Sequence, residues 1–74
     1  MYCVDTKELK KCMIDAGIET NAELSSKSGV NRNTIGDILN DKIYPSSDVM
    51  VKIVAALSLT SEKAGSIFFK KKLT

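Results

Sequence analysis

The sequence predicts an all-α protein, a compact five-helix bundle formed by a single domain of 74 residues. Apolar residues recur at helical spacing in several separate segments. Most of these segments follow a Ser, Thr, Asn or Asp side chain that can cap a helix. No segment alternates apolar and polar residues as a half-buried strand would. Only the short N-terminal segment 1–4 and the Lys-rich tail 70–74 are expected to fray.

The first helix is expected to begin after Asp5 or Thr6 and to end at Gly17. Its first turn is acidic, which suits the positive end of a helix dipole. The residues of its expected buried face recur every three or four positions, and they are Leu9, Cys12, Met13 and Ala16.

The central stretch from Ala22 to Asn40 predicts two short helices, 22–28 and 32–39, joined by a sharp corner. Gly29 is placed where the corner needs a positive φ, which glycine adopts without steric cost. Asn31 stands where the second of these helices needs an N-cap. The apolar residues expected to hold the corner together are Leu24, Val30, Ile35 and Ile38.

Two further helices are predicted over 47–57 and 61–69. Pro45 stops a helix from entering from the preceding loop, and Ser46 or Ser47 then caps the first of the two. Thr60 caps the second. Their expected core residues are Val49, Met50, Ile53, Val54 and Leu57 in the first, and Ala64, Ile67 and Phe68 in the second.

Taken together, these residues resemble the Cro and repressor family of lambdoid phages and their bacterial relatives, the lambda-repressor-like DNA-binding domains. The resemblance covers roughly residues 17–64. It rests on Leu24-Ser25, Gly29, Val30, Asn31, Ile35 and Ile38, and further on Pro45-Ser46, Lys52-Ile53 and Ala56-Leu57. It implies a helix-turn-helix in which helix 32–39 enters the major groove of double-stranded DNA.

The first turn of that helix is expected to face the bases. Arg32, the only arginine, offers a planar fork that matches guanine, and Asn33 can pair with adenine. Asp37 lies one turn further on the same side. It either accepts a hydrogen bond from cytosine or contacts Asn33 across one turn and orients its amide.

Contacts with the DNA backbone are expected from five polar residues around the motif, namely Asn21, Asn31, Thr34, Lys42 and Tyr44. The resemblance implies a loop after helix 32–39 with several basic residues, whereas this loop carries only Lys42. Gly36 also stands where related proteins often have a polar side chain. The poorly basic loop predicts weaker DNA binding, whereas Gly36 lets the backbone approach DNA closely but removes one position for reading bases.

One recognition helix reads only a few base pairs, so a homodimer is expected to bind two half-sites. The candidate residues for contact with another protein are Leu39, Phe69 and Leu73. Leu39 has a second interpretation, because it can equally serve as an additional core residue.

Two functions compete at this stage. The first is a sequence-specific transcription regulator of the phage Cro or repressor type. The second keeps the fold but acts on a protein, as a phage antirepressor, a modulator of a co-encoded repressor or an antitoxin-like partner would. The helix-turn-helix motif and Arg32 favour the first function. The features that support the second as the alternative are the low net charge of +2, Gly36, Asp37, Leu39 and the poorly basic loop.

Composition argues against other classes of function. The chain has no histidine for general-base work, no Gly-rich phosphate loop and no paired-carboxylate cleft that its pattern predicts, so no enzyme activity is expected. With no histidine and only two cysteines, a zinc site is not expected either, and no cofactor is predicted. Cys12 is expected to pack in the core, and Cys3 to be a free thiol near the chain end. The sequence shows neither a signal peptide nor a membrane-spanning segment, so we expect a protein of the reducing cytoplasm.

Overall fold

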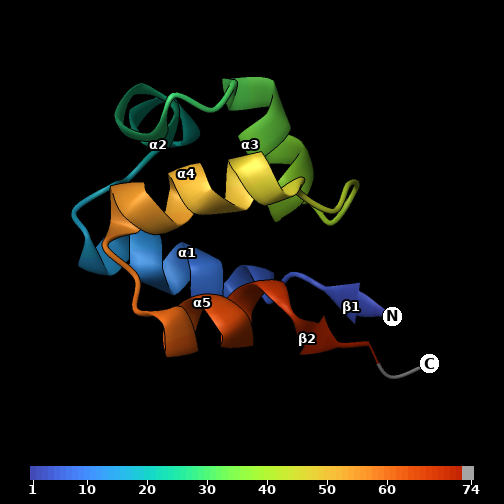
Figure 1. The fold of residues 1–74 in the computed structure, drawn as a ribbon. Coiled ribbons are helices and arrows are strands. Elements are labelled where there is room, and N and C mark those ends of the chain that lie inside the picture. Colours follow the sequence, from blue (N-terminus) through green and yellow to red (C-terminus); the bar gives the residue numbers. More distant parts are fainter. Residues whose placement is uncertain (73–74) are drawn as a thin grey trace.

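The computed structural model describes residues 1–72, which form five helices and a short two-stranded ribbon (Figure 1). In chain order these are β1 (Tyr2–Cys3), α1 (Thr6–Asp15), α2 (Asn21–Ser28), α3 (Arg32–Leu39), α4 (Ser47–Leu57), α5 (Ser61–Phe68) and β2 (Lys70–Lys71). The predicted all-α bundle of five helices is confirmed. The bounds of α3 and α4 agree with the prediction, whereas α2 begins one residue earlier and α5 ends one residue earlier than expected.

A side-chain cap opens every helix, which helps helices of only 8–11 residues to form. The capping residues are Asp5, Thr20, Asn31, Ser46 and Thr60, and each accepts a hydrogen bond from a backbone N–H two or three residues later. The cap of α2 is Thr20. Asn21 therefore lies in the first turn of α2 instead of capping it.

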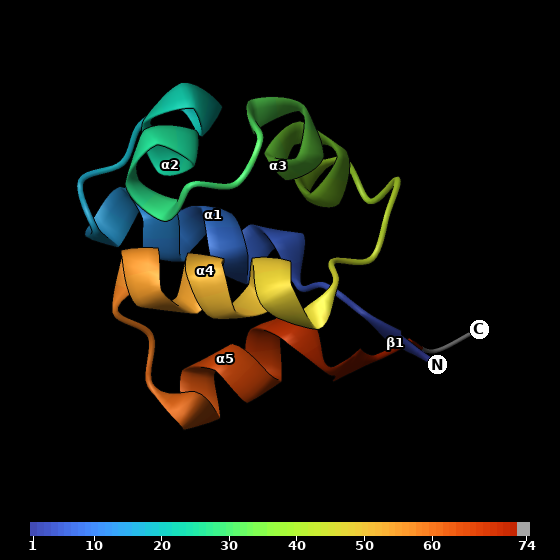
Figure 2. The same cartoon turned by 45° about the horizontal axis from the view of Figure 1, so that its top comes forward.

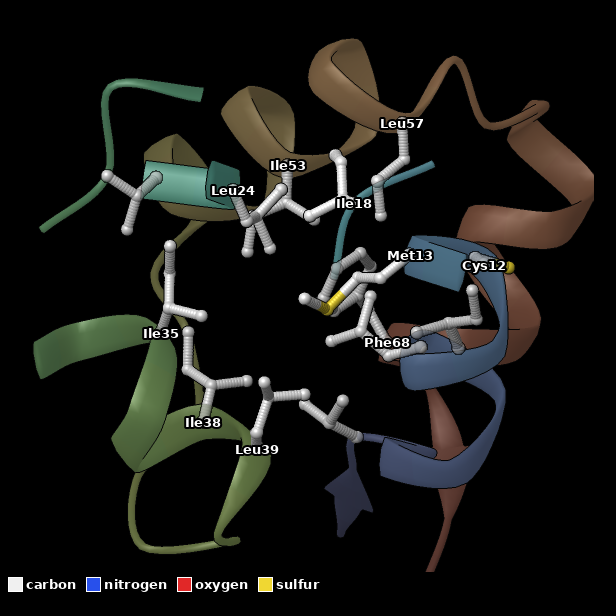
Figure 3. Packing of buried hydrophobic residues seen from close by; sticks show 14 residues of the cluster. Cys12, Met13, Ile18, Leu24, Ile35, Ile38, Leu39, Ile53, Leu57 and Phe68 are labelled. Atoms are coloured by element: carbon white, nitrogen blue, oxygen red, sulfur yellow. The ribbon is translucent and has the colours of Figure 1, made fainter. Parts of the chain in front are cut away.

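The helices share one apolar core, to which every helix contributes (Figure 3). Leu24 of α2, Ile35 of α3 and Ile53 of α4 point into it from three different helices, and all three are almost fully buried. Cys12 also lies in this core, as expected, and burial raises the pKa of its thiol. Leu39 is buried in the same cluster.

Up to residue 72, the two terminal segments differ from the expectation of fraying, whereas residues 73–74 lie outside the described part of the chain. Residues Tyr2 and Cys3 pair in antiparallel register with Lys71 and Lys70, and the amide of Lys72 donates to the Met1 carbonyl at 3.1 Å. The amide of Asp5 also donates to the carbonyl of Ile67 at 2.7 Å. The ribbon escaped prediction because two-residue strands are too short to show an alternating pattern. Packing of α1 against α5 brings the two segments together.

The helices are arranged in three levels (Figures 1 and 2). The helices α2 and α3 lie above α1 and α4, and α5 lies below them, beside the ribbon. The three levels leave the outer side of α2 and α3 uncovered by other helices.

Within residues 1–72, no helix has the length and apolar content needed to cross a membrane.

Candidate nucleic-acid interface

The corner between α2 and α3 is fixed by a glycine and a short set of hydrogen bonds. Gly29 has φ 79°, in the left-handed region, and its amide donates to the carbonyl of Ser25 at 2.8 Å. The Ser28 hydroxyl donates to the Leu24 carbonyl at 2.6 Å and accepts from the Val30 amide at 3.1 Å. Because Val30 is buried directly after the turn, the corner is anchored in the core. The chain thus enters α3 in a fixed direction.

We expect Gly29→Ala to lower the free energy of unfolding by about 1–2 kcal/mol, because an L-residue is strained in the left-handed region. No atom lies within 4 Å of the position that the new Cβ would take, so the loss comes from the backbone alone. Thermal unfolding followed by circular dichroism measures it. Gly29→Asn is the matched control, because asparagine tolerates this conformation better. Equal stability of the alanine variant and the wild type would contradict the assigned role of Gly29.

The helix α3 is held by its inner face and presents its first turn to solvent. Ile35 and Ile38 are each 1% exposed, whereas Arg32 and Asn33 are exposed. In residues 1–72 neither the Arg32 nor the Asn33 side chain makes a hydrogen bond or ion pair within the protein. Both predicted base-reading side chains are therefore free to meet a ligand.

The remaining polar residues of α3 are less exposed. Thr34 and Asp37 are half-buried. No hydrogen bond joins Asp37 to Asn33 in the described part of the chain, so the suggested orienting contact is not formed. Asn31 uses its side-chain oxygen to cap α3, accepting from the Asn33 amide at 2.8 Å. Its amide group still faces solvent as a donor.

The first turn of α2 lies next to the middle of α3. A Cβ on Gly36 would stand 3.7 Å from the side-chain nitrogen of Asn21, which is an ordinary contact distance. The proximity of Asn21 and Gly36 could not be predicted, because no local sequence pattern indicates that these two residues are neighbours. The structure brings the Asn21 amide over the position where α3 lacks a side chain. Asn21 and the first turn of α3 thus belong to one polar surface.

The loop after α3 corrects one predicted contact. Asp41 adopts a left-handed conformation with φ 60°, and the exposed Lys42 follows it. The Tyr44 hydroxyl, however, donates to the carbonyl of Phe68 at the end of α5. Burial raises the pKa of Tyr44, so this phenol keeps its proton at neutral pH. The hydroxyl predicted to contact phosphate is thus engaged inside the protein.

Two of the three residues proposed as protein contacts are placed by the structure. Leu39 lies in the core, so its interpretation as a contact for another protein is wrong. Phe69 is 52% exposed, and its ring meets Tyr2 edge-on, with the ring centroids 5.6 Å apart. Leu73 lies outside the described residues. The neighbouring Tyr2 was missed because its contact with Phe69 spans almost the whole sequence.

Comparison with protein families gives one match. The family model described as Cro/C1-type HTH DNA-binding domain matches residues 8–62, which is more than half of the chain and includes the whole of α2 and α3. Comparison with curated proteins and with solved structures gave no match. The resemblance that the sequence suggested is confirmed, and the match extends it into α1.

Proposed function

The chain belongs to the Cro/C1-type HTH DNA-binding domain family, and on this premise we propose that it is a sequence-specific transcription regulator of the phage Cro or repressor type. One observation carries the proposal. The helix α3 is anchored through Ile35 and Ile38 while Arg32 and Asn33 stand exposed at its first turn. This is the part of a recognition helix that contacts base edges.

The proposed contacts follow from side-chain chemistry. Arg32 forms two hydrogen bonds with guanine, Asn33 pairs with adenine, and Asp37 accepts from cytosine. Phosphate oxygens are bound by Asn21, Asn31, Thr34 and Lys42. Tyr44 is not among these contacts, because its hydroxyl donates to the carbonyl of Phe68. The proposed activity is binding without catalysis, and it takes place in the cytoplasm.

We further propose that two copies bind one operator. A single α3 reads only a few base pairs, and related arrangements place half-sites about 34 Å apart. The two copies then contact the same face of the duplex. No cofactor enters the proposed complex.

A second candidate function is action on a co-encoded repressor, as an antirepressor, repressor modulator or antitoxin-like protein. The observation that favours it is the weak basic character of the interface. This surface carries two acidic residues, Asp37 and Asp41, besides the basic Arg32 and Lys42. A protein with fewer cations at its interface releases fewer counterions from the DNA when it binds, so its free energy of DNA binding is less favourable. Both functions are compatible if the partner binds a surface away from α3.

Selection from a pool of random duplex DNA tests the first proposal. We expect enrichment of a pair of half-sites, and an affinity that falls with salt. For about four neutralised phosphates, the slope of log affinity against log salt is about −3.6. Because each of the two copies loses one phosphate contact, Lys42→Ala should reduce the magnitude of this slope by about 2. Lys63→Ala is the control, because Lys63 lies on α5 and pairs with Glu8.

The selection separates sequence-specific DNA binding from action on a protein alone. A pool without enrichment at low salt would contradict sequence-specific DNA binding. Co-purification of a repressor encoded by a neighbouring gene would then support the second function.

A further inference from the structure

Exposed apolar side chains gather at the ribbon end of the molecule. Within residues 1–72, five of the seven large apolar residues with high exposure lie in the ribbon, directly before one of its strands, or in the loop between α3 and α4. We call them the ribbon patch, and they are Met1, Tyr2, Ile43, Tyr44 and Phe69. The other two, Ile14 and Val51, lie on α1 and α4.

The patch is continuous and is held in place by specific contacts. The rings of Tyr2 and Phe69 meet at 87°, and the Tyr44 hydroxyl is bound to the carbonyl of Phe68. Met1, Tyr2, Ile43 and Tyr44 line a shared hollow of about 290 Å³. Since the ribbon and the loop are both fixed to α5, these side chains form a stable surface.

Four lysines lie at this end of the molecule. Lys42 and Lys72 line the hollow. Lys71 pairs with Tyr2 across the ribbon and shares its face, whereas Lys70 pairs with Cys3 on the other face. In residues 1–72 the ion pairs are Lys52–Asp48 and Lys63–Glu8, so none of these four lysines is paired. Asp41 is the one acidic residue of the hollow. The ribbon patch is therefore apolar at its centre and positively charged at its edge.

We propose that the ribbon patch is a docking surface for an extended acidic segment of a partner protein. Aromatic side chains surrounded by charged residues are typical of the energetically important centre of a protein interface. The lysines select a negatively charged segment, and the hollow accepts one apolar side chain from it. The ribbon has only two strands, so in the described structure each strand keeps an unpaired edge to which an extended segment can add.

Charge excludes the simplest alternative occupant. In a two-fold dimer through this patch, the same surface of each copy would face the other. The lysines on this surface of one copy would then approach those of its partner, and like charges across an interface are unfavourable. An acidic partner gains from the same lysines.

Position and size argue against two more occupants. Figure 1 shows the ribbon on the side of the molecule away from the loop that joins α2 and α3, and the patch with its lysines shares only Lys42 with the proposed phosphate contacts. The hollow is also at the lower edge of the roughly 300–1,000 Å³ typical of small-molecule sites. A partner segment can thus bind while the first turn of α3 contacts DNA, with Lys42 as the one residue for which the two ligands compete.

The test uses peptide selection on the immobilised full chain, without DNA. Random peptides of about a dozen residues are displayed and selected, and the strongest is measured by fluorescence anisotropy. We expect the selected peptides to carry several Asp or Glu residues and at least one large apolar residue. We also expect their affinity to fall with salt, because exposed charge pairs are screened.

Two variants assign the binding to the patch. Lys70→Ala/Lys71→Ala and Phe69→Ser should each weaken the selected peptide roughly tenfold or more. The matched controls, Lys10→Ala/Lys11→Ala on α1 and Val51→Ser on α4, change equally exposed side chains and should leave the affinity unchanged. All four variants should bind the selected duplex DNA as the wild type does, which separates this proposal from the DNA-binding one.

Several results would overturn the proposal. The first is a selection that yields no binder, or peptides without an excess of acidic residues. A dimer in sedimentation equilibrium that Phe69→Ser abolishes would assign the patch to a second copy. Binding of a fluorescent oligo(dT) that is lost in both patch variants would assign it to single-stranded nucleic acid, which also binds aromatic and basic side chains.

Discussion

Leu24→Ala is expected to lower the free energy of unfolding by about 2–5 kcal/mol, the range for truncating a buried leucine. Leu24 is completely buried, and it points from α2 toward Ile35 of α3 and Ile53 of α4 (Figure 3). Its removal leaves a cavity at the place where the helix-turn-helix meets the rest of the core. A domain of this size has a free energy of unfolding near the lower end of about 5–15 kcal/mol, so the variant should lose a large part of its total stability.

Urea unfolding followed by circular dichroism measures this loss. Val51→Ala is the matched control, because Val51 is 67% exposed on α4 and its truncation should change stability by less than about 0.5 kcal/mol. A loss below about 1 kcal/mol for Leu24→Ala would show that the site collapses around the cavity, or that α2 is not packed as described.

Arg32→Ala is expected to weaken binding to the selected operator by about 1–3 kcal/mol, which is the value of a good two-bond contact between arginine and guanine. The side chain is exposed and makes no hydrogen bond or ion pair within the described structure. The variant should therefore unfold at the same urea concentration as the wild type. Arg32→Lys should also lose affinity, because lysine lacks the planar fork.

Titrations with the operator and with a scrambled duplex separate base reading from phosphate binding. If Arg32 reads a base, the substitution weakens binding to the operator more than binding to the scrambled duplex. An equal loss on both duplexes would make Arg32 a phosphate contact. Lys42→Ala provides the comparison, since it is expected to weaken both complexes alike.

Local sequence signals predicted the helices well because each helix carries its own start and stop. Ser46 before α4 and Asn31 before α3 cap helices whose bounds agree with the prediction. Gly29 marked the corner because few other residues adopt its backbone conformation. The exposure of Arg32 and Asn33 followed from the burial of Ile35 and Ile38, which is a matter of helical periodicity.

Features that depend on contacts between residues far apart in the chain could not be predicted from the sequence. The ribbon pairs residues about seventy positions apart, and its strands are too short to show a pattern. The Tyr44 hydroxyl meets a carbonyl 24 residues later. The proximity of Asn21 and Gly36 depends on how α2 crosses α3. Leu39 was ambiguous because an apolar residue at a helix end fits both a core and an interface.

The meeting of the first and last described segments has a use in protein engineering. Met1 and Lys72 are already joined by a backbone hydrogen bond, so a short peptide link between them would require little rearrangement. Such a cyclic backbone restricts the unfolded chain far more than the folded one, and this difference favours folding. A small regulator of modest core size could in this way be made resistant to heat without touching α2 or α3.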